Sequence, residues 1–302
     1  MSTNESFMDR HHYLLRRLHS LTGIVPIGLF LIAHLTTNST IVWGAINKRA
    51  VDTLRAPDGV VEAGQAGELL ARQVGTFQHE VSFINNMPFL VLIEWTLWLS
   101  IAFHAVLGII YARSGQNNMA RYKYGGNTRY ALQRLTGYLG VLFIVYHIGT
   151  LRWGWTFLQP NGEPWSHTHA SSTLAAALRG HAGAWSIGGV FVALGYFAGV
   201  TALVFHFANG LWTAAITWGL TITEKAQRRW GVVCAVLGFA LMGAAWSSLA
   251  GFLALDYDSA REIEMALHGT PAHSMLVDTQ PETGPVLSTQ ANAPMHAEGE
   301  AQ

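Results

Sequence analysis

The stretch LVFHFANGLWTAAITW, residues 203–218, is the starting point for inferring the fold of this chain. It places His206 inside an apolar run long enough to cross a bilayer. A polar side chain in lipid is costly and is usually functional, so His206 needs a partner. A second copy of its surroundings, FHAVLG at 103–108, places His104 in the same FHxxxG pattern. In both copies a glycine lies one helical turn from the histidine, and we expect this strip without side chains to accommodate a flat ring.

The composition is typical of a membrane protein. Of the 302 residues, 50% are hydrophobic and 12% are charged, and the formal net charge is +0. This balance gives no reason to expect nucleic acid as a partner. The single cysteine, Cys234, excludes disulfides, and without a CxxCH motif any haem must be held without thioether bonds. The polar start MSTNESFMDRHH predicts no removable signal peptide.

Five segments reach the roughly 20 apolar residues that a membrane-spanning helix needs. They are 19–43, 88–112, 131–158, 185–219 and 230–254. The sequence therefore predicts an all-α integral membrane protein whose five-helix bundle occupies residues 19–254. We expect residues 1–18 to precede it as a short cytoplasmic segment and the polar residues 255–302 to form a disordered tail. Residues 44–87 are expected to be an external loop with a short helix near 63–74.

Basic residues predict the orientation of the bundle. They are concentrated before the first span and in the second and fourth connections, which therefore belong on the cytoplasmic side. These residues are Arg10, Arg16, Arg17, Arg113, Arg121, Lys123, Arg129, Arg134, Lys225, Arg228 and Arg229. The N-terminus is then cytoplasmic, and an odd number of spans places the C-terminus outside.

The chain also repeats an order of motifs. RLHSLTG at 17–23 opens the first span and is followed by His34, and RLTG at 134–137 opens the third span and is followed by His147. The second and fourth spans carry the two FHxxxG copies. This order predicts two helix pairs related by approximate symmetry, with the fifth helix packed outside. Gly23 and Gly140 precede His34 and His147 on nearly the same helical faces and leave room for a flat ring there too.

Depth along the helices predicts which histidines meet. At about 1.5 Å per residue, His34 lies roughly 25 Å beyond Arg17 and His147 roughly 20 Å beyond Arg134, so both belong to the outer half of the membrane. His104 lies only about 13 Å before Arg113, in the inner half. The repeated FHxxxG motif assigns His206 to the same half. We therefore expect an outer pair, His34 with His147, and an inner pair, His104 with His206.

Two imidazoles on opposite sides of one haem iron leave no open position for a substrate, and such a centre passes single electrons. Two such centres at different depths would relay electrons across the bilayer. A membrane histidine can instead form an interhelical hydrogen bond. The alternative function is therefore a histidine-lined proton channel or transporter, which would carry more acidic residues at mid-membrane than Glu94 alone.

Four segments resemble the dihaem cytochrome b membrane anchor of succinate:quinone oxidoreductases, the succinate dehydrogenases and fumarate reductases. They are RLHSLTGIVPIGLFLIAHLTTNS at 17–39, FINNMPFLVLIEW and FHAVLGIIYA within 83–112, RLTGYLGVLFIVYH at 134–147 and FHFANGLWTAAITWGLT at 205–221. The resemblance extends over residues 10–255.

This resemblance implies two haem b groups with iron ligands at His34, His147, His104 and His206. It also implies a flavoprotein subunit, an iron–sulfur subunit on the cytoplasmic face, a quinone such as menaquinone as substrate, and a location in the bacterial cytoplasmic membrane. A cytochrome b subunit of a hydrogenase or formate dehydrogenase is the second alternative.

Two positions depart from the family pattern. Some fumarate-reducing relatives carry a glutamate two residues before the fourth ligand, where this chain has Val204. Relatives also carry an acidic residue near the outer end of the second helix, where this chain has Asn85 and Asn86.

Other polar residues near the expected membrane surfaces are candidates for binding quinone or haem propionates. The outer candidates are His79, Glu80 and Glu94, and the inner ones are Arg17, Ser20 and Arg134, with His19 beside them. A solvated loop pair at 79–80 and positive-inside anchoring by the two arginines explain the same residues without a site.

Overall fold

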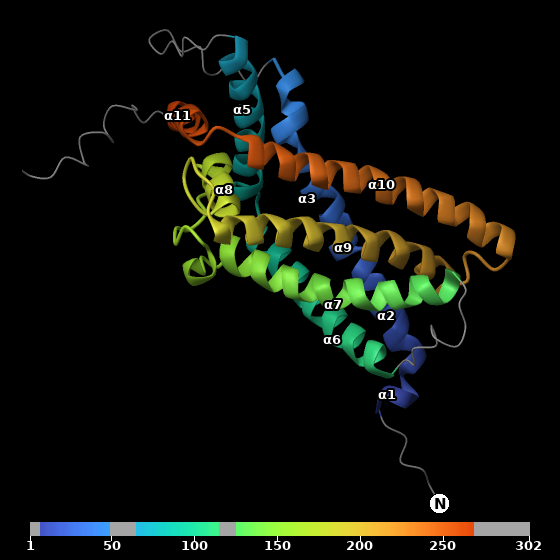
Figure 1. Ribbon diagram of the computed structural model, residues 1–302. Helices are drawn as coiled ribbons and strands as arrows, with labels where there is room; N and C mark the ends of the chain where they lie inside the picture. Colours follow the sequence, from blue (N-terminus) through green and yellow to red (C-terminus); the bar gives the residue numbers. More distant parts are fainter. Residues whose placement is uncertain (1–6, 49–64, 115–124, 269–302) are drawn as a thin grey trace, which may run out of the picture.

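The computed structural model describes residues 7–48, 65–114 and 125–268, and these residues form helices and connections without a strand (Figure 1). Five long apolar segments in this part of the chain are able to cross a membrane. They are α2 (His12–Ile24) continued by α3 (Pro26–Trp43), then α6 (Leu90–Ser114), α7 (Gly125–Leu151), α9 (Ile187–Thr217) and α10 (Glu224–Ala254). The predicted all-α, five-helix membrane fold is confirmed. The orientation of the two termini stays a prediction.

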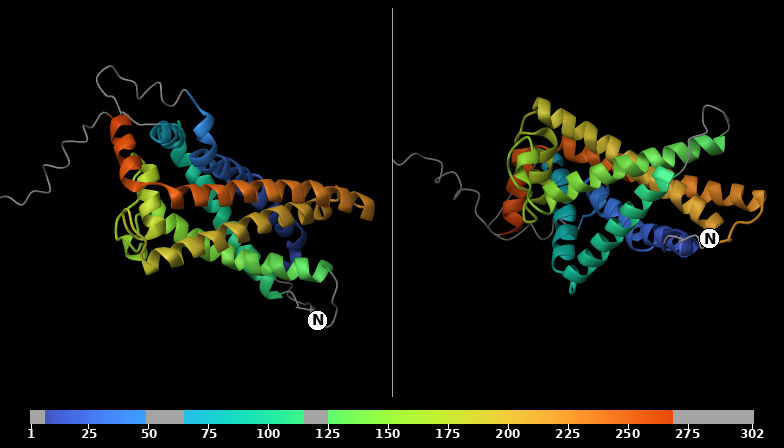
Figure 2. Two further views of the ribbon diagram at one scale, coloured as in Figure 1. Left: turned by 45° about the horizontal axis from the view of Figure 1, so that its top comes forward. Right: turned by 90° about the horizontal axis from the view of Figure 1, so that it is seen from below.

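The shorter elements lie at the two ends of this bundle. They are α1 (Phe7–Arg10), η1 (Gly44–Ile46), α5 (Gln65–Asn85), η2 (Thr156–Leu158), α8 (Ala170–Arg179) and α11 (Tyr257–Leu267). Helices α5, α8 and α11 contact one another at the end where α3, α7 and α10 finish, and we call these three helices the cap (Figure 2). The opposite end, which we call the basic end, carries Arg16, Arg17, Arg113, Arg129, Arg134 and Lys225.

The first span differs from the expected 19–43 because it starts at His12 and is interrupted at Val25. Pro26 begins α3, and since proline has no backbone N–H, the helical hydrogen bond to Thr22 is missing there. The Thr22 hydroxyl, a separate group, donates to the carbonyls of Leu18 and His19, each at 3.0 Å. The first span is therefore two helical segments joined at Val25.

The other bounds shift by a few residues. The third span ends at Leu151, earlier than the expected 158, and the chain then turns through Gly154, whose φ of 68° favours glycine. The fifth begins at Glu224, earlier than the expected 230, because the Thr223 hydroxyl caps its first turn by accepting from the Ala226 N–H. Helix α5 is longer than the short helix expected near 63–74 and continues to Asn85.

Residues 257–267 form α11, where we expected a disordered tail. The Asp256 carboxylate caps this helix by accepting from the Ser259 N–H at 2.9 Å, and Ala260 and Ile263 pack into an apolar core. Glu264 is fully buried and accepts from the Ser171 and Ser172 N–H groups at 2.6 and 3.2 Å. Hydropathy missed this helix because one of its fully buried positions, Glu264, carries a carboxylate. The rest of the expected tail, 269–302, lies outside the described residues.

The largest apolar core lies in and under the cap. It joins Val74 and Phe77 of α5 with Leu174 and Leu178 of α8, and it includes Tyr196 of α9. A smaller core lies deeper in the bundle, formed by Leu35, Val204, Phe207, Leu241 and Ala245. Tyr196 thus connects the cap to the membrane helices.

Buried polar side chains hold the cap together. Arg179, 8% exposed, donates to the carbonyl of Leu255 at the end of α10. Gln78 donates to the His167 carbonyl at 2.7 Å and accepts from the Ala170 N–H at 3.2 Å, while Glu264 accepts from the next two amides of α8. Burial raises the pKa of the Glu264 carboxyl and lowers the pKa of the Arg179 guanidinium.

Candidate functional site

Four histidines from four membrane helices meet as two pairs. His34 of α3 and His147 of α7 have ring centroids 5.7 Å apart and ring planes at 81°. His104 of α6 and His206 of α9 have centroids 6.1 Å apart and planes at 85°. A metal–imidazole bond is about 2 Å long, so two imidazoles on opposite sides of one iron have centroids roughly 6 Å apart. Edge-to-face packing of two aromatic rings gives centroid distances in the same range. The hydrogen bonds of the ring nitrogens distinguish a metal ligand from a packed ring.

Both rings of the inner pair use Nδ1 for a hydrogen bond to the backbone. His104 Nδ1 is 2.9 Å from the carbonyl oxygen of His19, and His206 Nδ1 is 3.0 Å from that of Gln133. A carbonyl oxygen only accepts, so each Nδ1 is the donor and a neutral ring keeps its lone pair on Nε2. This tautomer, oriented through its second nitrogen, is the form in which histidine binds metals.

Two glycines give the inner rings access to these carbonyls. Gly23 and Gly137 each follow the accepting residue by four positions in the repeated LTG motif. A Cβ on Gly23 would lie 2.5 Å from Cε1 of His104, and one on Gly137 would lie 3.1 Å from Cε1 of His206. The glycines therefore provide space for the imidazoles themselves.

The glycines that we expected to face a flat ring contact other groups. Gly108 and Gly210 of the FHxxxG motifs approach the side chains of His19 and Gln133, respectively. Gly140 faces Leu203. The open strip inferred from the sequence is thus absent at these three positions.

The two halves of the repeat differ around the inner rings. The His19 ring stacks on His104, with centroids 3.9 Å apart and an angle of 11°. Gln133, at the equivalent position, instead accepts from the Asn209 amide at 2.7 Å, and Asn209 accepts from Arg129 Nε at 2.9 Å. Sequence reasoning missed these partners, although His19 and Gln133 occupy the same place before LTG.

The outer pair has side-chain partners. His147 Nδ1 lies 3.3 Å from the hydroxyl oxygen of Tyr196. One helical turn before each ligand candidate, Phe30 stacks on His34 and Phe143 stacks on His147, with centroids 5.2 and 5.6 Å apart. All four paired histidines are half-buried in the chain.

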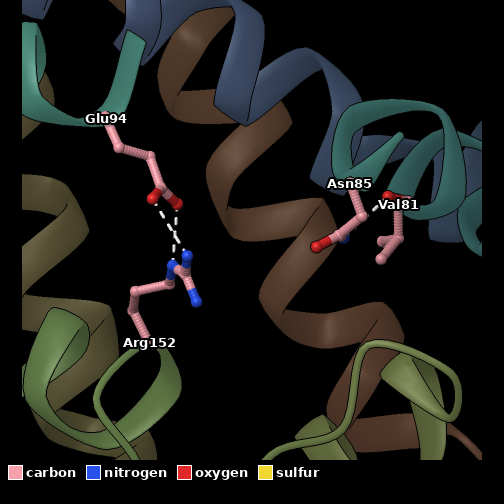
Figure 3. Close-up of polar contacts among 4 residues, drawn as sticks. All are labelled: Val81, Asn85, Glu94 and Arg152. Carbon is pink, nitrogen blue, oxygen red and sulfur yellow. Dashed lines mark hydrogen bonds and ion pairs between the residues drawn. The ribbon is translucent and has the colours of Figure 1, made fainter. Parts of the chain in front are cut away.

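Glu94 is engaged in an ion pair at the cap end (Figure 3). Arg152 Nε and Nη2 donate to its two carboxylate oxygens at 2.7 and 2.9 Å, and this pairing raises the pKa of Arg152. Asn85, drawn apart from this pair in Figure 3, donates to the carbonyl of Val81 at 2.9 Å. The Glu94 carboxylate and the Asn85 amide therefore already form hydrogen bonds within the protein.

His79 lies in an open groove of about 490 Å³ where α5 leads into α6. The groove is lined by His79, Ser82, Phe83, Asn86, Met87 and Pro88. Glu80 is not among the lining residues. The groove therefore combines an imidazole, a hydroxyl and an amide with apolar walls.

The candidates at the basic end divide into two groups. Arg17 lies over the rings of Tyr13 and Trp218, with Cζ 4.2 and 5.2 Å from their centroids, and its buried Nε has no hydrogen-bond partner among the described residues. Ser20 accepts from Trp218 Nε1 at 3.4 Å. Arg134 lies over the ring of Tyr130. Arg17 and Ser20 thus share a neighbour, whereas Arg134 has its own.

Val204 is a position at which this chain departs from the pattern of some fumarate-reducing relatives. It precedes His206 by two positions, is 1% exposed and packs in the deeper apolar core. The position at which some relatives carry a glutamate is therefore occupied here by a buried apolar side chain.

No family model and no solved structure matches the chain. The chain is similar to the succinate dehydrogenase cytochrome b558 subunit of Bacillus subtilis (strain 168), with 30% identity over 221 residues. The similarity spans 73% of this chain and 86% of that protein. The five membrane helices and this relationship together identify a multi-pass membrane protein that belongs to the family of cytochrome b membrane anchors of succinate:quinone oxidoreductases.

Proposed function

We propose that this chain is the electron-carrying membrane anchor of a succinate dehydrogenase or fumarate reductase complex, with two haem b groups. His34 and His147 would hold one haem, and His104 and His206 the other. The observation that carries the proposal is the meeting of four histidines from four membrane helices in two pairs with suitable ring separations. The name of the Bacillus relative, a cytochrome b558 subunit, supports haem of the b type.

The residues around the histidines would orient the ligands. A six-coordinate haem supplies one-electron transfer when bound. The carbonyls of His19 and Gln133 hold Nδ1 of the inner ligand candidates, which would leave Nε2 with a free lone pair to bind iron. Arg17, with its buried Nε free of protein partners among the described residues, is a candidate for binding a haem propionate at the basic end.

The positive-inside rule orients the complex. The basic end is then cytoplasmic and receives electrons from the iron–sulfur subunit, to which a flavoprotein subunit is attached, or returns electrons to it. The cap end faces outside, and the membrane is the bacterial cytoplasmic membrane. The groove at His79 and Asn86 would bind the head group of a quinone such as menaquinone, with the imidazole exchanging protons as electrons pass.

Haem content tests the ligand assignment. The purified membrane protein should show b-type bands in a reduced-minus-oxidised spectrum and contain two haems per chain. His104→Ala and His206→Ala should each lose the inner haem alone, and His34→Ala and His147→Ala the outer haem alone. His19→Gln is the matched control, because this ring stacks on His104 but is not assigned to iron.

The outcome also separates the alternatives. Absence of haem bands would favour the proton channel or transporter. Copurification with hydrogenase or formate dehydrogenase subunits would favour another respiratory cytochrome b.

The quinone groove is tested by a neighbouring pair of asparagines. Asn86→Ala should raise the KM for a menaquinol analogue while haem content stays unchanged. Asn85→Ala, whose amide bonds to its own helix, should leave the KM unchanged. Equal effects of the two substitutions would contradict the groove as the quinone site.

A further inference from the structure

We infer that Tyr196 is a positioning residue for the outer haem, because its hydroxyl is the hydrogen-bond partner of the ligand candidate His147. The inference rests on the proposed haem ligation by His147. It assigns to the cap a role at the outer site, since Tyr196 belongs to the apolar core formed with cap residues.

Packing fixes the position of the Tyr196 hydroxyl. The side chain is 9% exposed, and its ring lies edge-on to Phe143 with centroids 5.2 Å apart. The hydroxyl oxygen is 3.3 Å from Nδ1 of His147, and the two ring centroids are 5.8 Å apart. Because the tyrosine is held from several sides, its hydroxyl stands at a defined place beside the imidazole.

The chemistry of a haem ligand defines the direction of this hydrogen bond. When Nε2 of His147 binds iron, Nδ1 carries the hydrogen and the Tyr196 oxygen accepts it. An acceptor at the second nitrogen raises the basicity of a ligating imidazole and fixes its ring orientation. A more basic ligand favours the ferric over the ferrous state.

The second ligand of the outer pair has no comparable acceptor among the described residues. Among the described residues, the side chain in hydrogen-bond range of the His34 ring nitrogens is that of Asn38, whose amide nitrogen is 3.5 Å from Nδ1 and 3.4 Å from Nε2. That nitrogen donates to the His34 carbonyl at 2.8 Å, which fixes it as the NH₂ group and not the oxygen. Tyr196 is therefore the acceptor on which the outer site depends.

The inner and outer pairs differ in the kind of group that accepts from Nδ1. Its two acceptors are main-chain carbonyls, which persist when the side chains of His19 or Gln133 are replaced. The acceptor of the outer pair is a side-chain hydroxyl, which a single substitution removes. Tyr196→Phe deletes this hydroxyl and keeps the ring that fills the core.

Tyr146→Phe is the matched control. Tyr146 is adjacent to His147 in sequence and 6.2 Å from Tyr196 between ring centroids, but its hydroxyl donates to the Leu158 carbonyl at 3.4 Å. Potentiometric titration of the purified, haem-loaded complex gives the two haem potentials for each variant, and the inner haem is an internal reference in the same molecule.

We expect Tyr196→Phe to retain both haems and to shift the ferric–ferrous equilibrium of the outer haem about tenfold toward ferrous, a rise of about 59 mV for one electron. The inner haem should keep its potential, and Tyr146→Phe should change neither. Selective loss of the outer haem in Tyr196→Phe would support the same role.

Three results would overturn the inference: an unchanged outer potential in Tyr196→Phe, an equal change in Tyr146→Phe, or loss of both haems together. Absence of haem from the unsubstituted protein would instead contradict the proposed function.

Discussion

Replacing Gly23 by alanine should displace the His104 ring and weaken binding of the inner haem that we propose. The added Cβ would lie 2.5 Å from Cε1 and 3.0 Å from Nδ1 of His104, well inside ordinary contact distance. The ring must retreat by roughly 1 Å, which stretches its 2.9 Å hydrogen bond to the His19 carbonyl beyond the normal limit of about 3.2 Å.

The magnitude follows from these two effects. Overpacking costs about 1–3 kcal/mol and the lost hydrogen bond about 0.5–1.5 kcal/mol. Together they predict an inner-haem affinity weaker by roughly 1.5–4.5 kcal/mol, which is about 10- to 2,000-fold. Gly137→Ala makes the milder contact of 3.1 Å with His206 Cε1, so it should cost less than about 1 kcal/mol, below about fivefold.

The assay is titration of the haem-free complex with haem, followed by spectra that distinguish the inner from the outer haem. Gly195→Ala, in α9, is the control because no atom lies within 4 Å of the added Cβ. The reasoning is refuted if Gly23→Ala binds the inner haem as tightly as this control does, or if the outer haem is lost first.

The remaining predictions concern stability, measured by thermal unfolding of the detergent-solubilised protein. Because burial raises the pKa of Glu264, its contribution should be complete below the ordinary value of 4.5 and should decline as the pH rises through the raised value. Glu264→Gln should remove this pH dependence, and a pH profile equal to that of the native protein would contradict it. Arg179→Met should cost about 1–3 kcal/mol, because the Leu255 carbonyl loses its donor in the buried cap, and an unchanged melting temperature would argue against this. A double-mutant cycle with Glu94→Gln and Arg152→Gln should give a coupling of only about 0.2–1 kcal/mol, since the Arg152 side chain is 56% exposed, and a much larger value would show that solvent screening is weaker than assumed.

The five-helix fold could be predicted from the sequence because apolar runs of sufficient length have few alternatives to a membrane helix. The meeting of His34 with His147 and of His104 with His206 followed from the repeated motifs and from depth, two properties that are local to each helix. Their role as haem ligands stays a prediction.

The partners of these rings could not be predicted in the same way. The acceptors of His104 and His206 are backbone carbonyls, which every residue has, so no residue type marks them. Tyr196 and His147 lie 49 residues apart on different helices, and their contact depends on how α7 and α9 pack. Glu264 was assigned to a tail because the chain after Leu255 is polar, and its burial depends on the amides of Ser171 and Ser172 and on the Ser172 hydroxyl, which all donate to its carboxylate.

The proline in the first membrane helix has a geometric consequence for the whole bundle. Gly23, which contacts His104, belongs to α2, whereas His34 belongs to α3. The inner pair thus packs against α2 through Gly23, whereas the outer pair takes one of its rings, His34, from α3 on the other side of Val25. In the proposed dihaem arrangement, the joint at Val25 would therefore help to set the distance between the two pairs, and the rate of electron tunnelling would fall steeply as that distance grows.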